Sequence, residues 1–397
     1  MPSRLRTLNE LDASGKRVLV RVDYNVPMND GAMSDDSRLR ATLPTLQHLL
    51  NRRAAVVICS HLGRPDGKVV ETLRLAPIAR RLSQMLDRPV ATVSDCIGPE
   101  VEAAVAALRP GQALLLENLR FHPEEERNDP VFARELAALA DLYVNDAFAA
   151  AHRAHASTEG VAHLLPSAAG FLMEKEVSSL SRLLQEPARP FATIIGGAKV
   201  STKATVLEHL LQRVDALLVG GGMACTFLAA EGYEMGRSLV EKEVLPTARD
   251  FINAARQRGV SLLLPSDAVV VRELKAHAPH ETVGIAEVGP DQMMVDIGPD
   301  TVRQFREMLQ RSRTVFWNGP LGVFEMPPFD QGTRLVAEAM AGLDAVTMVG
   351  GGETVAAVEQ AGLAWRFTHV STGGGASLEF LEGRTLPGVA ALMQATT

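Results

Sequence analysis

The repeating pattern of the chain is clearest in residues 191–222, which read FATIIGGAKVSTKATVLEHLLQRVDALLVGGG. An apolar run at 191–195 is followed by glycines and then by a stretch with helical periodicity. A second apolar run, at 216–219, again ends in glycines. Strand-like segments that alternate with helix-like segments predict a parallel sheet covered by helices on both faces.

The same alternation extends over the whole chain. Strand-like runs occur at 17–22, 54–59, 89–93, 113–116, 142–144, 191–195, 216–219, 261–264, 314–317, 345–349 and 367–370. Helix-like stretches in the first half lie at 36–53, 75–87, 99–108 and 131–141. These runs are too many for one sheet of usual size, so we expect two sheets.

The position of the boundary between the two sheets follows from composition. Residues 1–170 contain 8 of the 32 glycines, so the glycine-rich chemistry belongs to the second part. A helical pattern at 174–189 ends at Pro187 and predicts a linker helix. The sequence therefore predicts an α/β protein with two doubly wound parallel-sheet domains, the first over 1–173 and the second from residue 190 onward.

Composition excludes several classes of protein. The 397 residues carry 40 Lys+Arg and 47 Asp+Glu, and a net charge of −7 is unlike that of a nucleic-acid binder. No apolar window is long enough to span a membrane, and the polar N-terminus shows no export signal, so we expect a cytoplasmic protein. Cys59, Cys96 and Cys225 predict neither a disulfide framework nor a metal site, because their spacing fits neither.

Glycine clusters follow four strand-like runs of the second half. They lie at 196–197, 220–222, 350–352 and 373–375. A single cluster could be a tight turn between strand and helix, but four favour a ligand that carries phosphate, because glycine lets the backbone approach it closely. Lys199 and Lys203 are four residues apart and would share a helix face beside that ligand. Two solvated surface lysines are the alternative.

Glu353 and Thr354 follow the third glycine cluster at an expected helix start. An acid there could stabilise the helix dipole, or it could hold Mg²⁺ on a bound nucleotide. Three familiar motifs are absent from the sequence: the Walker motif, the dinucleotide fingerprint after the first strand, and the protein-kinase set.

The strand ends of the first half carry a different chemistry. Arginine, histidine and polar residues follow four of the runs or begin a helix: Arg21, Asp23, Asn25, Arg38, His61, Arg64, Arg120, His152, Arg153 and His155. In a parallel sheet these segments meet at one edge and form a basic site, which suits a small polyanion. Each residue taken alone could instead be solvated or ion-paired at the surface.

The sequence resembles the phosphoglycerate kinase family along essentially its whole length. The matching segments are RVDYNVP (21–27), HLGRP (61–65), ENLRF (117–121), AHRAH (151–155), GGAKV (196–200), WNGPLGVFE (317–325), GGGET (350–354) and STGGGAS (371–377). The resemblance implies two domains joined by a hinge helix, with a last helix at about 383–397 that returns to the N-terminal domain. The nucleotide-binding domain would then span 190–382.

The resemblance also assigns roles to individual residues. It implies 3-phosphoglycerate binding by Asp23, Asn25, Arg38, His61, Leu62, Gly63, Arg64, Arg120 and Arg153. It implies nucleotide binding by Gly196, Lys199, Lys203, Asn318, Glu325, Gly351, Gly352, Glu353 and Thr354. Arg38, Lys199 and Gly374 would be catalytic, and Glu353 would contact Mg²⁺ through the bound ATP or ADP. The family usually has aspartate at the position of Glu353. Because glutamate is one methylene longer and keeps the charge, we expect metal binding to survive with a shifted metal geometry.

The implied reaction is reversible phosphoryl transfer between ATP and the carboxylate of 3-phosphoglycerate, a step of glycolysis. A carboxylate is ionised at neutral pH, which agrees with the lack of an evident catalytic base. We expect a monomer whose domains close about the hinge, with no nucleic acid or membrane as partner. A dehydrogenase, a different carboxylate kinase, or a non-catalytic binding protein on the same fold are the alternatives.

Overall fold

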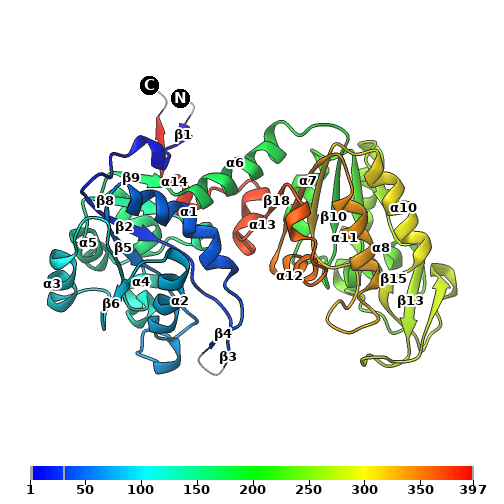
Figure 1. The fold of residues 1–397 in the computed structure, drawn as a ribbon. Coiled ribbons are helices and arrows are strands. Elements are labelled where there is room, and N and C mark those ends of the chain that lie inside the picture. Colours follow the sequence, from blue (N-terminus) through cyan, green and yellow to red (C-terminus); the bar gives the residue numbers. More distant parts are fainter. Residues whose placement is uncertain (1–2, 30–31, 396–397) are drawn as a thin grey trace. The chain divides into compact units, whose positions relative to one another are not determined.

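The structure is a computed structural model that describes residues 3–29 and 32–395. The chain forms two compact units (Figure 1). Unit 1 consists of Met1–Ser178 and Thr385–Thr397, and unit 2 consists of Ser179–Arg384. The boundary lies inside α6 (Phe171–Gln185), which overlaps the stretch predicted as a linker helix. The role of this helix as a hinge stays a prediction.

Unit 1 is built on a sheet of six parallel strands. In spatial order they are β6 (Val90–Thr92), β7 (Ala113–Leu115), β5 (Ala55–Cys59), β2 (Arg17–Arg21), β8 (Leu142–Asn145) and β9 (Ser167–Ala169). The helices are α1 (Ser37–Asn51), α2 (Ala76–Leu86), α3 (Pro99–Ala107), α4 (Pro123–Glu126), α5 (Pro130–Ala138) and α14 (Pro387–Ala390). All five predicted strands of this half are present. The sequence did not predict β9, because its three small residues carry no β-branched signal.

Unit 2 contains a second sheet of six parallel strands, and all six were predicted. Their spatial order is β12 (Ser261–Leu263), β11 (Ala216–Val219), β10 (Phe191–Ile195), β16 (Thr314–Asn318), β17 (Val346–Gly350) and β18 (His369–Val370). The helices are α7 (Ala204–Leu211), α8 (Gly221–Glu231), α9 (Leu245–Gln257), α10 (Pro299–Gln310), α11 (Gln331–Ala341), α12 (Gly352–Gln360) and α13 (Gly375–Leu381). The two parallel sheets confirm the predicted fold class.

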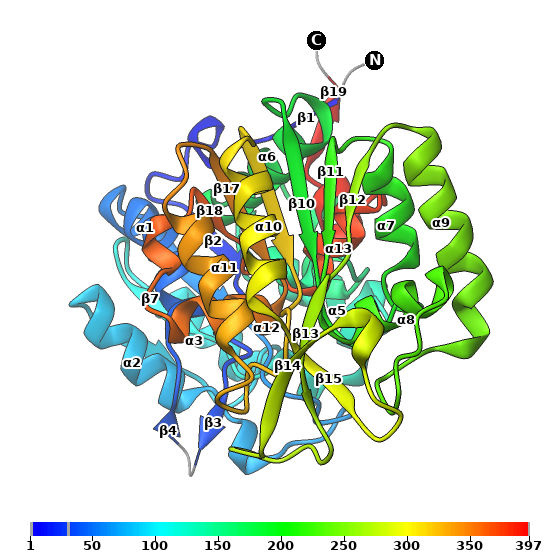
Figure 2. The same ribbon diagram turned by 90° about the vertical axis from the view of Figure 1, so that its right-hand side faces the viewer.

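The sequence did not predict a small antiparallel sheet in unit 2. Its strands are β13 (Asp267–Val271), β14 (His280–Gly284) and β15 (Met293–Ile297), and β13 pairs with both of the others (Figure 2). The β14 strand is largely exposed, so it lacks the continuous apolar run by which the buried strands were recognised.

The end of the chain differs from the expected return helix at 383–397. Only the four-residue α14 is helical there, and the chain continues into β19 (Met393–Ala395). This strand pairs antiparallel with β1 (Ser3–Leu5), which joins the two ends of the described chain within unit 1 (Figure 1). Residues 396–397 of that prediction lie outside the described residues. A two-stranded hairpin, β3 (Met28–Asn29) and β4 (Ala32–Met33), completes unit 1.

Each unit has its own apolar core. Val20 and Ile58 on the central strands are fully buried in unit 1, and Ile194, Leu218 and Trp317 are fully buried in unit 2. Burial of one Val, Leu or Ile side chain contributes about 1.5–3 kcal/mol. Rigid strands therefore hold the loops at their carboxyl ends, where the predicted site residues lie. No helix in the described part of the chain is long and apolar enough to cross a membrane.

Candidate active site

The loop after β2 and the start of α1 form the first half of a basic site in unit 1. Arg38 lies in the first turn of α1, and its Nη1 is 2.7 Å from Oδ1 of Asp23. The same carboxylate oxygen accepts a hydrogen bond from the backbone N–H of Asn25. Burial alone would raise the pKa of Asp23, but the neighbouring His61, Arg38 and Arg21 outweigh it and the pKa falls to about 2. Asp23 is therefore a permanent anion that orients Arg38.

The loop after β5 contributes the second half of this site. The backbone N–H of Gly63 donates to Oδ1 of Asn25 at 2.9 Å, and the carbonyl of Gly63 accepts from Nη1 of Arg120 at 2.9 Å. Gly63 has a φ of +65°, a conformation that favours glycine. Asn118 holds the preceding residue, Leu62, on both its N–H and its carbonyl. Three loops that are distant in sequence are thus joined into one surface.

Arg21, which the sequence placed at the basic site but to which the resemblance assigned no role, is a buried support of this surface. Only 1 % of the residue is exposed. Its guanidinium donates to Oγ of Ser157 at 2.8 Å, to the carbonyl of Val22, and to Nδ1 of His61 at 3.0 Å. Ser157 in turn donates to the fully buried carboxylate of Glu125 at 2.6 Å. No local sequence signal identifies this chain of contacts, because its members are separated by up to 136 residues.

Arg153 and Arg64 complete the set of predicted arginines. Nε of Arg153 donates to Nε2 of His152 at 3.1 Å. Burial, together with the charges of Arg21, Arg120 and Arg153, lowers the pKa of His155 to about 3, so this histidine is neutral. Arg64 is exposed beside the Gly63 turn. The structure therefore connects Asp23, Asn25, Arg38, Gly63 and Arg120 by direct contacts.

Unit 2 presents a site that is built mainly from backbone. The loop after β10 and the loop after β16 meet, because the N–H of Gly196 donates to the carbonyl of Asn318 at 2.9 Å. Nζ of Lys203 donates to the carbonyl of Gly196 and to Oδ1 of Asn318, both at 2.7 Å. Burial lowers the pKa of Lys203 to about 8, although the nearby carboxylate of Glu353 opposes this shift. The ammonium group is thus part of the scaffold that shapes the loop.

The expectation that Lys199 and Lys203 share a helix face is wrong. Helix α7 begins at Ala204, so both lysines lie in the turn that precedes it. Lys199 is exposed, whereas Lys203 folds back onto the loop. The reason is that the ammonium of Lys203 donates to the carbonyl of Gly196 and to the side-chain oxygen of Asn318, so this segment forms a turn and not the first turn of the helix.

Glycines in these loops are required for close approach. A Cβ on Gly196 would lie 2.1 Å from the carbonyl oxygen of Pro320, and one on Gly319 would lie 2.2 Å from that of Gly196. Gly351 has a φ of +90°, and a Cβ there would lie 2.5 Å from Nδ2 of Asn318. The hydroxyl oxygen of the buried Thr354 accepts from the N–H of Gly319 at 2.6 Å. The loops after β10, β16 and β17 are therefore fixed to one another.

A cavity of about 550 Å³ opens beside these loops, entirely within unit 2. Its walls include the glycine turns at Gly197, Gly221 and Gly222, and the carboxylates of Glu325 and Glu353. Arg237, Ser238 and Leu239 also line it, and sequence reasoning missed them because no motif marks them. The cavity size and the exposed backbone suit a nucleotide.

Gly352 and Gly374 lie near two helix starts in unit 2. Gly352 is the first residue of α12, whose first turn contains Glu353. Gly374 precedes α13 and has a φ of +53°, and a Cβ there would meet no atom within 4 Å. The need for glycine at 374 is therefore conformational rather than steric in this structure.

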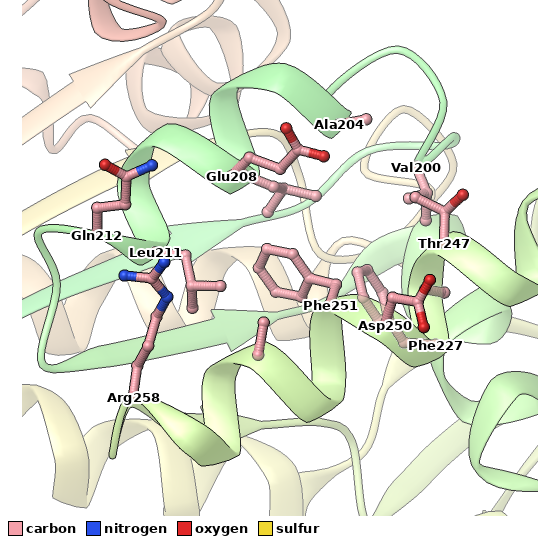
Figure 3. Close-up of a pocket in the computed structure, with 13 residues that line it drawn as sticks. Val200, Ala204, Glu208, Leu211, Gln212, Phe227, Thr247, Asp250, Phe251 and Arg258 are labelled. Carbon is pink, nitrogen blue, oxygen red and sulfur yellow. The ribbon is translucent and has the colours of Figure 1, made fainter.

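A second cavity of unit 2, of about 390 Å³, contains none of the predicted site residues. It is a groove between α7 and α9, with Leu211, Phe227 and Phe251 on its apolar side and Glu208 and Arg258 at its rim (Figure 3). It includes Val200 from the loop after β10 but none of the glycines.

The residues present fit Mg²⁺ carried by a nucleotide. Mg²⁺ is commonly held by one or two carboxylates together with phosphate oxygens and water. The carboxylate of Glu353 lines the cavity and acts electrostatically on Lys203. Glu353 can therefore supply a protein oxygen for the ion.

Comparison with known proteins gives a consistent result. The family model described as phosphoglycerate kinase matches residues 8–384. The phosphoglycerate kinase of Moorella thermoacetica is 60% identical over 98% of this chain and 99% of its own length. That of a Roseiflexus species is 56% identical over 98% of this chain and 99% of its own length. These relatives define an enzyme of the class that transfers phosphoryl groups to a carboxyl acceptor.

The solved structures agree in fold and sequence. The structure of phosphoglycerate kinase from Coxiella burnetii has a TM-score of 0.89 and 43% identity, and covers 98% of this chain and 99% of that one. The corresponding enzyme from Pyrococcus horikoshii has a TM-score of 0.83 and 33% identity, with 98% of both chains covered. The chain belongs to the phosphoglycerate kinase family.

Proposed function

We propose that the enzyme catalyses reversible, Mg²⁺-dependent phosphoryl transfer between ATP and 3-phosphoglycerate, with ADP and 1,3-bisphosphoglycerate as the products. The observation that carries this proposal is that the two kinds of site lie on different units. Unit 1 carries the connected basic surface of Arg38 and Arg120, and unit 2 carries the glycine-lined cavity beside Lys203.

Binding of 3-phosphoglycerate is assigned to the basic surface of unit 1. A guanidinium has five N–H donors, and Arg38 uses Nη1 on Asp23, which leaves further donors for a carboxylate or phosphate. Arg120 likewise uses Nη1 on Gly63. Asp23 and Gly63 therefore act as positioning groups that keep both arginines preorganised, which lowers the conformational entropy lost on binding.

Binding of ATP or ADP is assigned to the cavity of unit 2. Helix α12 begins at Gly352, and the free N–H groups of such a helix start attract phosphate. The exposed Lys199 is free to reach the terminal phosphate, whereas Lys203 holds the loop that carries it. When bound, Mg²⁺ neutralises phosphate charge.

No general base is needed for this reaction, since the attacking carboxylate is already ionised. Catalysis then consists of positioning and of neutralising charge on the transferred group. Arg38 and Lys199 supply positive charge, and backbone N–H groups around Gly374 are the third proposed contributor. Because the substrates bind to different units, we propose that the units close about α6 during the reaction.

A coupled assay tests the proposal. The protein is incubated with ATP, MgCl₂ and 3-phosphoglycerate, and 1,3-bisphosphoglycerate formation is followed by NADH oxidation in the presence of excess glyceraldehyde-3-phosphate dehydrogenase. We expect turnover that needs all three components. Turnover that persists without 3-phosphoglycerate, or no turnover while both ligands bind by calorimetry, would refute the proposed reaction. Closure is tested by small-angle scattering, which must show compaction when both substrates are present.

We also propose that the enzyme is a cytoplasmic monomer. The three cysteines, whose spacing fits no disulfide framework, support the location. Sedimentation equilibrium tests the oligomeric state, with a mass of 42.7 kDa expected for a monomer.

A further inference from the structure

Unit 1 contains a cluster of three metal-ligand types outside both proposed substrate sites. Asp95 and Cys96 lie in the loop after β6, and His122 lies between the short helix η3 (Leu119–Phe121) and α4. One ligand atom from each residue lies within 4.8 Å of the other two. The spacing of the three cysteines had predicted no metal site. Asp95 neighbours Cys96 in the sequence, but only folding brings His122 to them.

The loops that carry these residues are already tied together. Nε2 of His122 is 2.6 Å from Oδ1 of Asp95, and the N–H of Cys96 donates to the same oxygen at 2.7 Å. The carbonyl of Asp95 accepts from the N–H of Glu117, which joins the loop after β6 to the end of β7. The ring of His122 packs against Phe132 at a centroid distance of 5.4 Å. The three side chains therefore converge without large rearrangement of the backbone.

We propose that Asp95, Cys96 and His122 form a binding site for Zn²⁺. Thiolate, imidazole and carboxylate are the ligands that Zn²⁺ takes in proteins, whereas Mg²⁺ prefers oxygen alone. With metal–ligand bonds of about 2.0–2.3 Å, ligand atoms in a tetrahedral site lie roughly 3.3–3.8 Å apart. Binding needs the 2.6 Å contact between His122 and Asp95 to open by about 0.7 Å.

The exposure of the three residues determines how an ion would enter. Cys96 is fully buried, whereas 49 % of the Asp95 side chain and 26 % of the His122 side chain are exposed. An ion would therefore approach from the side of Asp95 and His122 and meet the sulfur at the bottom of the site. Zn²⁺ binds the thiolate, so the thiol proton is released to solvent. Three protein ligands leave a fourth position for water on the exposed side.

A purely structural role is the alternative. The His122–Asp95 contact could serve as a surface ion pair over a packed thiol, and such pairs contribute about 0–1 kcal/mol. The two interpretations differ in whether the sulfur takes part. A measurement that reports on a metal–sulfur bond therefore separates them.

The experiment uses the full chain without nucleotide, reduced and freed of metal, and titrated with Co²⁺ in place of Zn²⁺. We expect one Co²⁺ per chain, a thiolate-to-cobalt absorption band in the near ultraviolet, and displacement of Co²⁺ by Zn²⁺. Cys96→Ser should abolish the band. His122→Gln should weaken Co²⁺ binding about 100-fold, as expected for loss of one of three ligands.

Cys225→Ser is the matched control, because Cys225 is equally buried but lies in unit 2 beside Met294. It should leave the band and the affinity unchanged. The absence of a band in the parent protein, or a band that survives Cys96→Ser, would overturn the proposal. If circular dichroism shows that Cys96→Ser does not fold, His122→Gln decides, since its partly exposed ring tolerates replacement and unchanged Co²⁺ affinity would also overturn the site.

Discussion

The two units carry their sites on similar parallel sheets but build them by different means. In unit 1 the site consists of charged side chains, each oriented by a partner, as in the pair of Arg38 and Asp23. In unit 2 it consists of backbone loops packed so closely that only glycine fits, as at Gly196 and Gly319. A small polyanion needs charges at fixed positions, whereas a nucleotide needs room and free N–H groups. In the proposed function, the same fold serves two ligands by changing the chemistry of its loops.

The largest expected effect is the loss of an essential charge from unit 1. Arg38→Ala should lower turnover by about 10²–10³-fold, by analogy with the loss of a donor that stabilises a transition-state anion. The coupled assay measures it. Arg40→Ala is the control, because Arg40 lies on the same helix but is 61 % exposed and pairs with Asp36. Similar losses in both variants would mean that α1 is merely destabilised.

Close packing of the loops in unit 2 gives the next largest effect. In Gly196→Ala the new methyl group would lie 2.1 Å from the carbonyl oxygen of Pro320, so the loops must separate. We expect a loss of about 2–3 kcal/mol in unfolding free energy and nucleotide affinity lowered about 100-fold. Urea unfolding and calorimetric titration with ADP measure these quantities.

Gly342→Ala is the control for this substitution. Gly342 has a φ of −92°, and the nearest atom to an added Cβ is 3.6 Å away. Its unfolding free energy should stay within about 0.5 kcal/mol of the parent. Unchanged ADP affinity in Gly196→Ala would show that the loop contact does not shape the nucleotide site.

Glu353 is the residue of unit 2 that we propose as the Mg²⁺ contact, as the arginines of unit 1 are the proposed contacts of 3-phosphoglycerate. Glu353→Gln keeps the size but removes the charge, and should raise the Mg²⁺ concentration for half-maximal activity about 10-fold. Glu353→Asp keeps the charge and restores the residue usual in the family, so it should stay within about 3-fold of the parent. Equal Mg²⁺ dependence of all three proteins would remove Glu353 from the metal site.

The smallest expected effect is a difference in pH dependence between the two sites. Lys203 has a pKa of about 8, so its ammonium is present below that pH and is lost above it. The KM for ATP should therefore rise by a few-fold as pH increases through about 8, and Lys203→Met should lack this inflection. The KM for 3-phosphoglycerate should show no inflection between about pH 7 and 9, where the substrate phosphate is already fully ionised and Asp23, with a pKa of about 2, stays ionised.

The same shift predicts a change in stability with a definite sign. The folded pKa of Lys203 lies below its ordinary value of 10.5, so the unfolded chain binds more protons between about pH 8 and 10.5. The unfolding free energy of the parent relative to Lys203→Met should therefore increase with pH in this window. Urea unfolding at two pH values measures it, and a decrease would contradict the assigned burial of the ammonium.

Much of the fold could be predicted because its signals are local. All strands of the second parallel sheet appear in the sequence as short β-branched or apolar runs, and helices such as α1 and α2 appear within two residues of their predicted ends. The strands β9 and β14 could not be predicted, since one is short and made of small residues and the other is exposed. Neither carries the apolar periodicity on which prediction from sequence depends.

For the candidate site, the sequence determined which residue types follow each strand, and so predicted a basic site in one half and a phosphate-binding backbone in the other. The tertiary structure decided which of them touch. It paired Arg38 with Asp23, turned Lys203 back onto Asn318, placed Arg21 beneath His61, and brought His122 to Cys96. The propensity of a segment to form a helix or a strand depends on a few neighbouring residues, so the sequence reveals it. These contacts, in contrast, join segments as far apart as 115 residues. Such contacts exist only once the packed core has fixed the positions of the strands.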